Sequence, residues 1–133
     1  MHVRVHLGRE RYAVPIANVL EIADVGEVAP VPGAPAAVLG VRNLRGQVMP
    51  VIDLSRVLGV ETSERAQRLL VAEEGGRQAG LAVDLVTDVE SLPDADEDAA
   101  SPCLSGAALV DGALVGVVDV AALFDAVQGG RAT

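Results

Sequence analysis

Residues 40–54 read GVRNLRGQVMPVIDL, and a weaker copy of this stretch returns near the C-terminus. Aligning Gly40 with Gly106 keeps the other glycines, an aspartate and the apolar positions in register at one constant spacing. The matched pairs are Gly46 and Gly112, Val48 and Leu114, Val51 and Val117, Ile52 and Val118, Asp53 and Asp119, Leu54 and Val120, and Leu58 and Phe124. This shared register predicts an internal duplication.

The copy extends upstream, where VPIANVLEI at 14–22 matches LAVDLVTDV at 81–89. Chance similarity between two segments rich in valine, alanine and glycine is the alternative explanation. The constant spacing of glycines and acidic residues favours duplication over chance. Each copy then covers about half of the chain. Within this match the triplet Val19, Glu21 and Ile22 falls on Val86, Asp88 and Val89.

The composition is that of a globular protein, and its charge leaves other proteins as the expected partners. Half of the 133 residues are hydrophobic, and ten arginines without any lysine leave a formal net charge of −9. An acidic surface repels phosphate backbones and anionic lipid, so we expect no nucleic acid partner and no direct membrane binding. Cys103 has no disulfide partner, and no apolar run approaches the ~18 residues that cross a bilayer. A cytoplasmic location is the expectation.

Short alternating apolar runs separated by turn residues predict a mostly β chain with few helices. The architecture is then either two small barrels side by side or one sandwich. Pro50 inside a strand-like run predicts an edge strand or a bulge. Asp53 or Ser55 is expected to cap a short helix that Gly59 ends, and prolines at 30, 32 and 35 predict an exposed, ordered connector. The expected strand pairs are 2–7 with 11–16, 40–44 with 48–54, 69–73 with 78–83, and two strands within 104–120 around Asp111 and Gly112, followed by a terminal helix over 120–128.

The chain resembles the CheW-like domain family. The residues that carry the resemblance are V-x-E-I at 19–22, G-V-x-N-L-R-G at 40–46 and V-x-P-V-I-D-L at 48–54, with looser matches at VDLVTDVESL and LVGVVDVAALF. The resemblance implies two intertwined five-stranded SH3-like β-barrels with short helices and a pseudo-duplicated plan. One CheW-like domain would span 1–133. Its first barrel would cover about 14–65, with a strand contribution from 1–13, and its second 66–133.

Proteins of this family are adaptors without an active site or cofactor. The resemblance implies two partners, the cytoplasmic tip of a methyl-accepting chemotaxis receptor and the regulatory domain of a CheA-type histidine kinase. The receptor groove it implies contains Val19, Glu21, Gly40, Val41, Asn43, Leu44, Arg45 and Gly46. The kinase surface it implies contains Leu85, Val86, Asp88, Leu109, Val110 and Leu114.

Glu21 and Arg45 are the charges set most tightly in apolar sequence. We expect them to form an ion pair that fixes the wall of the receptor groove, because a guanidinium can bind a carboxylate through two parallel hydrogen bonds. If the pair is exposed to water it contributes at most ~1 kcal/mol. If it is desolvated, removal of one partner costs roughly 3–5 kcal/mol.

Two other functions remain open. One is a CheW-like scaffold of a non-chemotaxis pathway, such as surface motility or development, and the other is a small β-barrel enzyme or ligand-binding protein. His2 and His6 have no neighbours at metal-ligand spacing, and Cys103 has no basic neighbour that would activate it. The acidic stretch 93–102 is short where relatives carry a longer segment, which argues against assembly of hexameric rings with the kinase.

Overall fold

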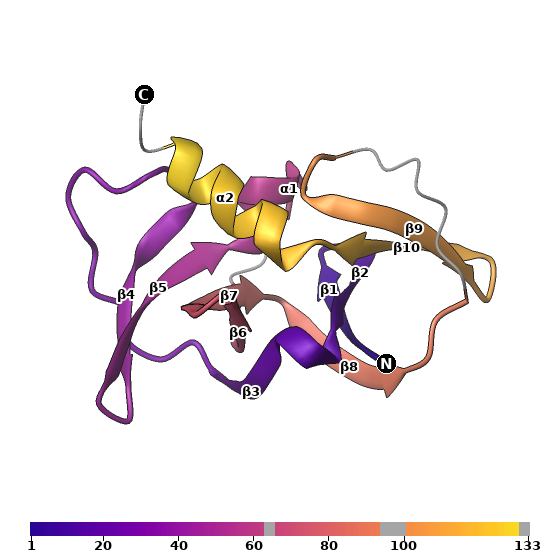
Figure 1. Cartoon of the computed structure of the whole chain (residues 1–133), viewed down its shortest axis with the longest axis horizontal. Helices are drawn as coiled ribbons and strands as arrows, with labels where there is room; N and C mark the ends of the chain where they lie inside the picture. The colour runs from indigo at the N-terminus through magenta and orange to yellow at the C-terminus, as the bar shows by residue number, and fades with distance from the viewer. Residues whose placement is uncertain (63–65, 94–100, 131–133) are drawn as a thin grey trace.

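The computed structural model describes residues 1–62, 66–93 and 101–130, with Gly129 and Gly130 by their backbone alone. Within these ranges ten strands form two five-stranded sheets, accompanied by three short helical segments (Figure 1). The predicted mostly β class is therefore confirmed. None of the helices in the described ranges has the length and apolar character needed to span a membrane.

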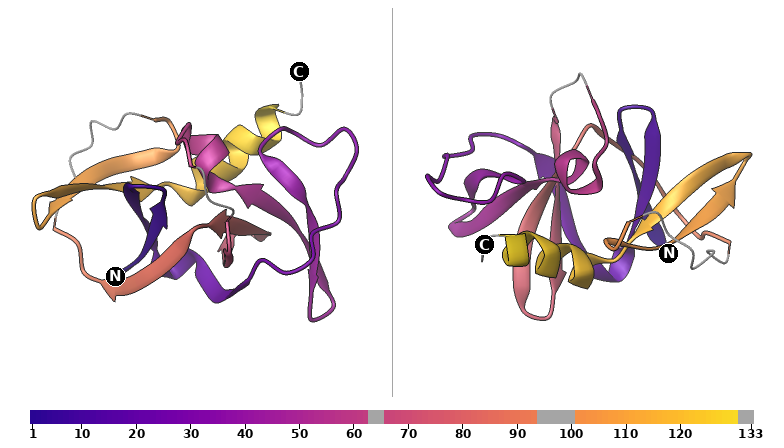
Figure 2. Two further views of the ribbon diagram at one scale, coloured as in Figure 1. Left: turned by 180° about the vertical axis from the view of Figure 1, so that it is seen from behind. Right: turned by 90° about the horizontal axis from the view of Figure 1, so that it is seen from above.

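We call one group of strands the first sheet, with the order β3-β6-β7-β5-β4, and the other the second sheet, with the order β8-β1-β2-β10-β9. Seen from above, the N-terminal hairpin (indigo) stands beside the C-terminal strands (orange), and β4 and β5 (magenta) lie on the opposite side (Figure 2). The first sheet contains β3 (Val19–Asp24), β4 (Val38–Leu44), β5 (Gln47–Asp53), β6 (Arg68–Glu74) and β7 (Arg77–Val83). The second contains β1 (His2–Leu7), β2 (Glu10–Pro15), β8 (Leu85–Glu90), β9 (Leu104–Val110) and β10 (Ala113–Val118).

The two sheets do not divide the chain between residues 65 and 66, where the two predicted barrels meet. β6 and β7 belong to the first sheet, and the N-terminal hairpin β1–β2 belongs to the second. Two parallel contacts, β5 with β7 and β2 with β10, create this exchange. Hydrophobic alternation marks a strand but not its distant partner, so this pairing was not available from the sequence pattern.

The predicted duplication is confirmed in the backbone. The β4–β5 and β9–β10 hairpins turn at the same matched position, where Arg45 and Asp111 have φ angles of 52° and 51° and each precedes a glycine of positive φ. A register shift also precedes Gly40 in one hairpin and Gly106 in the other. Two residues of positive φ suit the tight hairpin turn whose twist matches the strands.

A matched aspartate also follows each hairpin and caps a helix. Asp53 accepts a hydrogen bond from the Ser55 amide at 3.1 Å before α1 (Leu54–Leu58). Asp119 accepts one from the Ala122 amide at 3.0 Å at the start of α2 (Val120–Gly130). Each carboxylate satisfies an amide that has no partner within its helix. Gly59 ends α1 with a φ of 70°, as predicted.

Two apolar clusters hold the fold. The shared core lies between the sheets and joins side chains of both, including Val5, Leu70 and Leu81, with Leu123 and Phe124 of α2. The inner core of the first sheet lies on that sheet's other face. Successive residues of a strand point to opposite faces, so Leu69 enters the inner core while Leu70 enters the shared core. The inner core consists of Met49, Val51, Leu69, Val71 and Ala82.

Two strand predictions need correction. Ile16 is not on the face of β2 that buries Tyr12 and Val14, because the chain turns into η1 (Ile16–Asn18) and leaves Ile16 44% exposed. Pro50 is not on an edge strand, because β5 lies between β7 and β4, whereas the alternative of a bulge is close to the structure, since a register shift lies opposite Val51 and Ile52. The missing amide of Pro50 costs no ladder hydrogen bond, since pairing with β7 begins at Val51.

Candidate functional site

The predicted ion pair between Glu21 and Arg45 is present. Glu21 lies on β3 and Arg45 in the β4–β5 turn, at the two opposite edges of the first sheet. The Arg42 Nε group also donates to the Val25 carbonyl at 2.7 Å, so a second contact joins these edges. The first sheet therefore curls until its edges meet, as a barrel requires.

The exposure of the Glu21–Arg45 ion pair decides between the two predicted contributions to stability, that of an exposed pair and that of a desolvated pair. The Arg45 side chain is 70% exposed and that of Glu21 is 32% exposed. Solvent screens such a pair, so its contribution to stability lies at the low end, about 1 kcal/mol or less. The ion pair orients two side chains at the surface and is not a buried salt bridge.

Three predicted groove residues position backbone. The Asn43 Oδ1 atom accepts a hydrogen bond from the Gly46 amide at 2.9 Å and fixes the turn before Arg45. Gly40 has a φ of 151°, and a Cβ there would stand 2.2 Å from the Ala29 carbonyl oxygen. Val41 exchanges two hydrogen bonds of 2.9 Å with Ala29. Gly40 thus permits a close approach of the connector to β4, a role beyond that of a turn residue.

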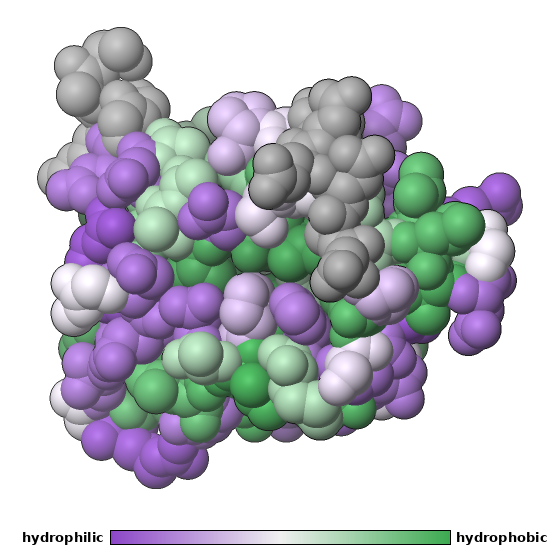
Figure 3. Space-filling model, turned by 45° about the vertical axis from the view of Figure 1, so that its right-hand side comes forward, coloured by the Kyte–Doolittle hydropathy of each residue, from purple (hydrophilic) through white to green (hydrophobic). Residues whose placement is uncertain are grey.

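The apolar candidates of the first sheet divide by exposure. Val19 packs partly against the shared core, and Leu44 against the inner core. Leu20 and Ile22 are 51% and 45% exposed. Val48 is 61% exposed and was not among the predicted groove residues, although the burial of its neighbour Met49 makes this orientation a consequence of alternation. Green apolar patches separated by purple hydrophilic surface cover the face in Figure 3.

The predicted kinase residues occupy two places. Leu85, Val86 and Asp88 lie on β8, at one edge of the second sheet, and the other three lie on the β9–β10 hairpin at the opposite edge. Leu109 and Leu114 face each other across the hairpin and are 63% and 69% exposed. Val86 packs partly against the shared core. The hairpin therefore presents an exposed apolar pair that is separate from β8 in the pairing order of the sheet.

Three ionisable groups outside these surfaces have shifted pKa values, His2, His6 and Cys103. Burial lowers the pKa of His2 and of His6 from 6.5, and the charges of Arg11 and Arg4 also lower that of His6. Burial raises the pKa of the Cys103 thiol, which disfavours the reactive thiolate. In the described ranges no three or more His, Cys, Asp or Glu side chains gather as a metal site would require. Most of the predicted acidic loop, residues 94–100, lies outside these ranges.

Comparisons with known proteins agree with this geometry. The family model described as CheW-like domain matches residues 2–128. The chain is 41% identical over 92 residues to the chemotaxis protein CheW of Rhizobium meliloti, which covers 68% of this chain and 59% of that relative. It is 36% identical over 124 residues to Protein FrzA of Myxococcus xanthus, covering 92% of this chain and 76% of the relative.

A solved structure has the same fold over nearly the whole chain. The crystal structure of the scaffolding protein TtCheW from Thermoanaerobacter tengcongensis superposes with a TM-score of 0.82 at 27% identity, over 93% of this chain and 91% of the other. The matched range of the family model includes both sheets and both matched hairpins. The chain belongs to the CheW-like domain family.

Proposed function

We propose that this chain is a non-catalytic adaptor that couples the cytoplasmic tip of a chemoreceptor to the regulatory domain of a CheA-type histidine kinase. One observation supports this most directly: separate exposed apolar surfaces lie on two sheets that share one core. Leu20 and Ile22 form the surface on β3, and Leu109 and Leu114 form that on the β9–β10 hairpin. A shared core fixes the relative orientation of two surfaces, which is what an adaptor needs.

The receptor surface in this proposal is centred on β3 and the β4–β5 turn. The exposed Leu20 and Ile22 supply apolar contact area, and the Glu21–Arg45 pair beside them supplies orientation. Such a surface suits an amphipathic helical partner, whose apolar face covers the leucine and isoleucine. Asn43 and Gly46 would act indirectly, by holding the turn that carries Arg45, and Gly40 by admitting the connector against β4.

The kinase surface is centred on Leu109 and Leu114. Both are more than 60% exposed, although large apolar side chains gain free energy from burial. Leu85 and Asp88 lie on β8 at the other edge of the second sheet, so they would form a second, separate part of the kinase contact. We expect each contact alone to be of roughly micromolar affinity, about 8 kcal/mol, with multivalent assembly supplying the remaining strength.

A three-component pull-down tests the proposal. A receptor cytoplasmic fragment and a kinase regulatory domain are both retained by the intact chain if it couples them. Leu20→Asp is expected to lose the receptor fragment alone, and Leu114→Asp the kinase domain alone, since each places a charge in one contact. Val31→Asp, at an exposed apolar position outside both surfaces, is the matched control and retains both partners.

Two outcomes would contradict the adaptor. Retention of neither partner by the intact chain rules out coupling. Loss of both partners in either single variant, with an unchanged melting temperature, contradicts the separation of the two surfaces. A shift in melting temperature identifies a folding defect and not a lost contact.

A second pathway is supported by one comparison. The similarity to FrzA covers 92% of the present chain, and FrzA is not named as a chemotaxis protein. The same two surfaces would then serve another receptor and kinase pair, as in surface motility or development. Pull-downs against receptor fragments of both pathway types, with the kinase domain held constant, distinguish the two.

A further inference from the structure

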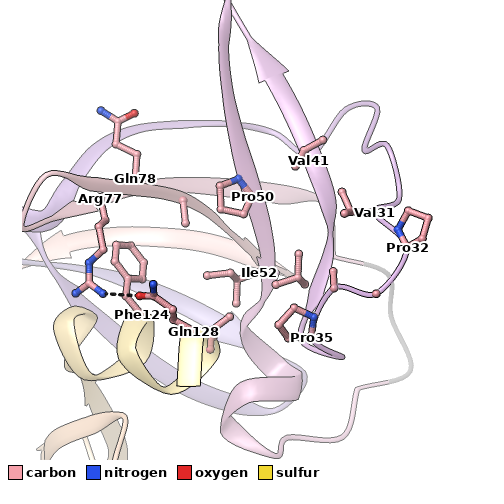
Figure 4. Close-up of a pocket in the computed structure, with 15 residues that line it drawn as sticks. Val31, Pro32, Pro35, Val41, Pro50, Ile52, Arg77, Gln78, Phe124 and Gln128 are labelled. Carbon is pink, nitrogen blue, oxygen red and sulfur yellow. Dashed lines mark hydrogen bonds between the residues drawn. The ribbon is translucent and has the colours of Figure 1, made fainter. Parts of the chain in front are cut away.

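A pocket on another side of the molecule is not used by the proposed coupling function. It lies between α2, the connector that precedes β4, and the strands β4, β5 and β7, and encloses about 520 Å³ (Figure 4). Among the predicted groove and kinase residues only Val41 reaches it. A volume of this size is typical of sites for small molecules. Its apolar lining includes Val31, Pro35, Val41, Pro50, Ile52 and Phe124.

The connector wall of this pocket is fixed by hydrogen bonds. The Val38 amide donates to the Pro35 carbonyl at 2.9 Å, and the Ala34 amide donates to the Val31 carbonyl at 3.2 Å. The Arg56 Nη1 group donates to the Ala36 carbonyl at 2.9 Å, which ties the connector to α1. Proline rings further restrict the backbone here. A ligand would therefore enter a preformed site, which lowers the entropic cost of binding.

One end of the pocket is cationic. Arg77 is the only charged side chain among the described residues that line it, and its guanidinium lies 5.5 Å from the centroid of the Phe124 ring. Nη1 donates to Asp125 at 2.9 Å and, at 3.4 Å, to Gln128. Nε and Nη2 donate no hydrogen bond within the described ranges, although Nη2 lies 4.0 Å from Glu74. Two donor groups of the guanidinium thus remain for a ligand.

The neighbouring carboxylates neutralise this end only in part. Asp125 is 70% exposed, so water screens its pair with Arg77. Glu74 is in contact only at the outer limit of an ion pair. In a chain of net charge −9, a cation facing an apolar pocket is an unusual local charge. It complements an anion attached to an apolar group.

We propose that this pocket binds a small aliphatic carboxylate. The hydrocarbon chain would lie among the valines and prolines, and its carboxylate would accept hydrogen bonds from the Nε and Nη2 groups of Arg77. An arginine fork matches the two oxygens of a carboxylate. A neutral apolar molecule would leave these donors unused, and a phosphate ester would fit the charge but not the apolar lining.

Binding at this site would also affect the fold. α2 supplies Leu123 and Phe124 to the shared core, while its Val127 and Gln128 line the pocket. A ligand would therefore contact α2 and the first sheet together. A ligand that binds only the folded chain stabilises it by RT ln(1 + L/Kd), where L is the free ligand concentration, so the melting temperature rises with ligand concentration.

Octanoate is the probe for the first experiment, with octan-1-ol as the uncharged comparison, both followed by amide chemical shifts of the intact chain at pH 7. We expect octanoate to shift amides of α2, β7 and residues 31–38, with a dissociation constant of roughly 1 mM or below for a ligand of about ten heavy atoms. Octan-1-ol is expected to bind about tenfold more weakly, since it lacks the charge-assisted hydrogen bonds.

Three variants locate the binding. Arg77→Gln is expected to weaken octanoate binding about tenfold and to leave octan-1-ol unchanged. Arg68→Gln is the matched control, because Arg68 is also an exposed arginine paired with an aspartate, Asp24, yet does not line the pocket. Val31→Trp, at a position 43% exposed on the connector, is expected to fill the pocket and abolish the shifts of both probes.

Several results would overturn the proposal. These are the absence of shifts at 10 millimolar octanoate (about ten times the expected constant), shifts confined to β3 or the β9–β10 hairpin, and equal binding of octanoate and octan-1-ol. Equal loss in Arg77→Gln and Arg68→Gln would also overturn it, because charge alone would then explain the binding. The melting temperature of each variant separates misfolding from lost binding. None of these readouts depends on receptor or kinase coupling.

Discussion

The two sheets are built on one plan but are stabilised differently. β6 of the first sheet corresponds to β1 of the second, because Leu69 pairs with Ala82 and Ala23 in the same register in which His2 pairs with Pro15 and Glu90. On the face away from the shared core, the first sheet carries Leu69 and Val71. The second carries His2 and Arg4 at the corresponding positions. The inner core of the first sheet is apolar, whereas the matching face of the second sheet combines the buried Val115 and Val117 with these two polar residues.

The polar atoms of His2 and Arg4 have only some of their possible hydrogen-bond partners. Arg4 forms an ion pair with Glu90, and their side chains are 11% and 27% exposed. The Arg4 Nε and His2 Nδ1 atoms are buried without a hydrogen-bond partner in the described ranges. An unpaired buried polar atom costs about 1–3 kcal/mol. The second sheet thus depends more strongly on the shared core for its stability.

The edges of the two sheets also differ in how their charges can pair. Glu21 and Arg45 close the first sheet, while the corresponding residues of the second, Asp88 and Asp111, are both acidic. Two carboxylates repel each other and cannot form this closing pair. The first copy is therefore the more apolar of the two and is closed by an ion pair, where the second copy has two aspartates.

The largest effect on stability is expected for substitution of two adjacent leucines of β6. Leu69→Ala and Leu70→Ala each remove a fully buried side chain, so each is expected to lower the free energy of unfolding by about 2–5 kcal/mol in urea titrations. Their hydrogen exchange should differ. Leu70→Ala, in the shared core, is expected to speed exchange in β1 and β2, and Leu69→Ala mainly in β4 to β7. Equal acceleration of β1 and β2 by both variants would show that the inner core does not serve the first sheet alone.

A smaller effect on stability is expected when Arg4 and Glu90 of the second sheet are replaced by the residues found at the matching positions of the first sheet. Arg4→Val alone leaves Glu90 partly buried and unpaired, and is expected to cost about 1–3 kcal/mol of unfolding free energy. The double variant Arg4→Val with Glu90→Ala matches Val71 and Ala23, and is expected to be neutral or stabilising. Chemical unfolding of the two single variants and the double variant measures this cycle. A double variant less stable than either single one would contradict the view that the ion pair replaces an apolar core.

The smallest effect is expected at the exposed pair. A double-mutant cycle of Glu21→Gln and Arg45→Gln should give a coupling of about 1 kcal/mol or less, because Arg45 is largely in water. One molar salt should reduce this coupling more than that of Arg4 and Glu90, which are less exposed. A coupling above about 2 kcal/mol, insensitive to salt, would mean that the groove wall is desolvated.

Much of the local structure followed from particular residues. Asp53 and Gly59 bound a short helix because a carboxylate caps free amides and glycine accepts the left-handed conformation. Gly75 and Gly76 join β6 to β7, and alternation placed Val3, Val5 and Leu7 on one buried face. The pair Glu21–Arg45 was also predictable, from two charges set in apolar sequence and from the family resemblance. Its exposure was not, because burial depends on which elements cover the turn.

The sequence by itself determined most of the strands, their turns, the duplicated plan and the family, because these depend on neighbouring residues and on a period of two. Only the tertiary structure decided that β1 and β2 join the C-terminal strands, and that Pro50 lies in an inner strand. It alone also brought Arg77, Phe124 and the proline connector together around one pocket. The reason is physical: local preferences fix a strand and its faces, whereas its distant partners follow from the packing of all apolar faces at once.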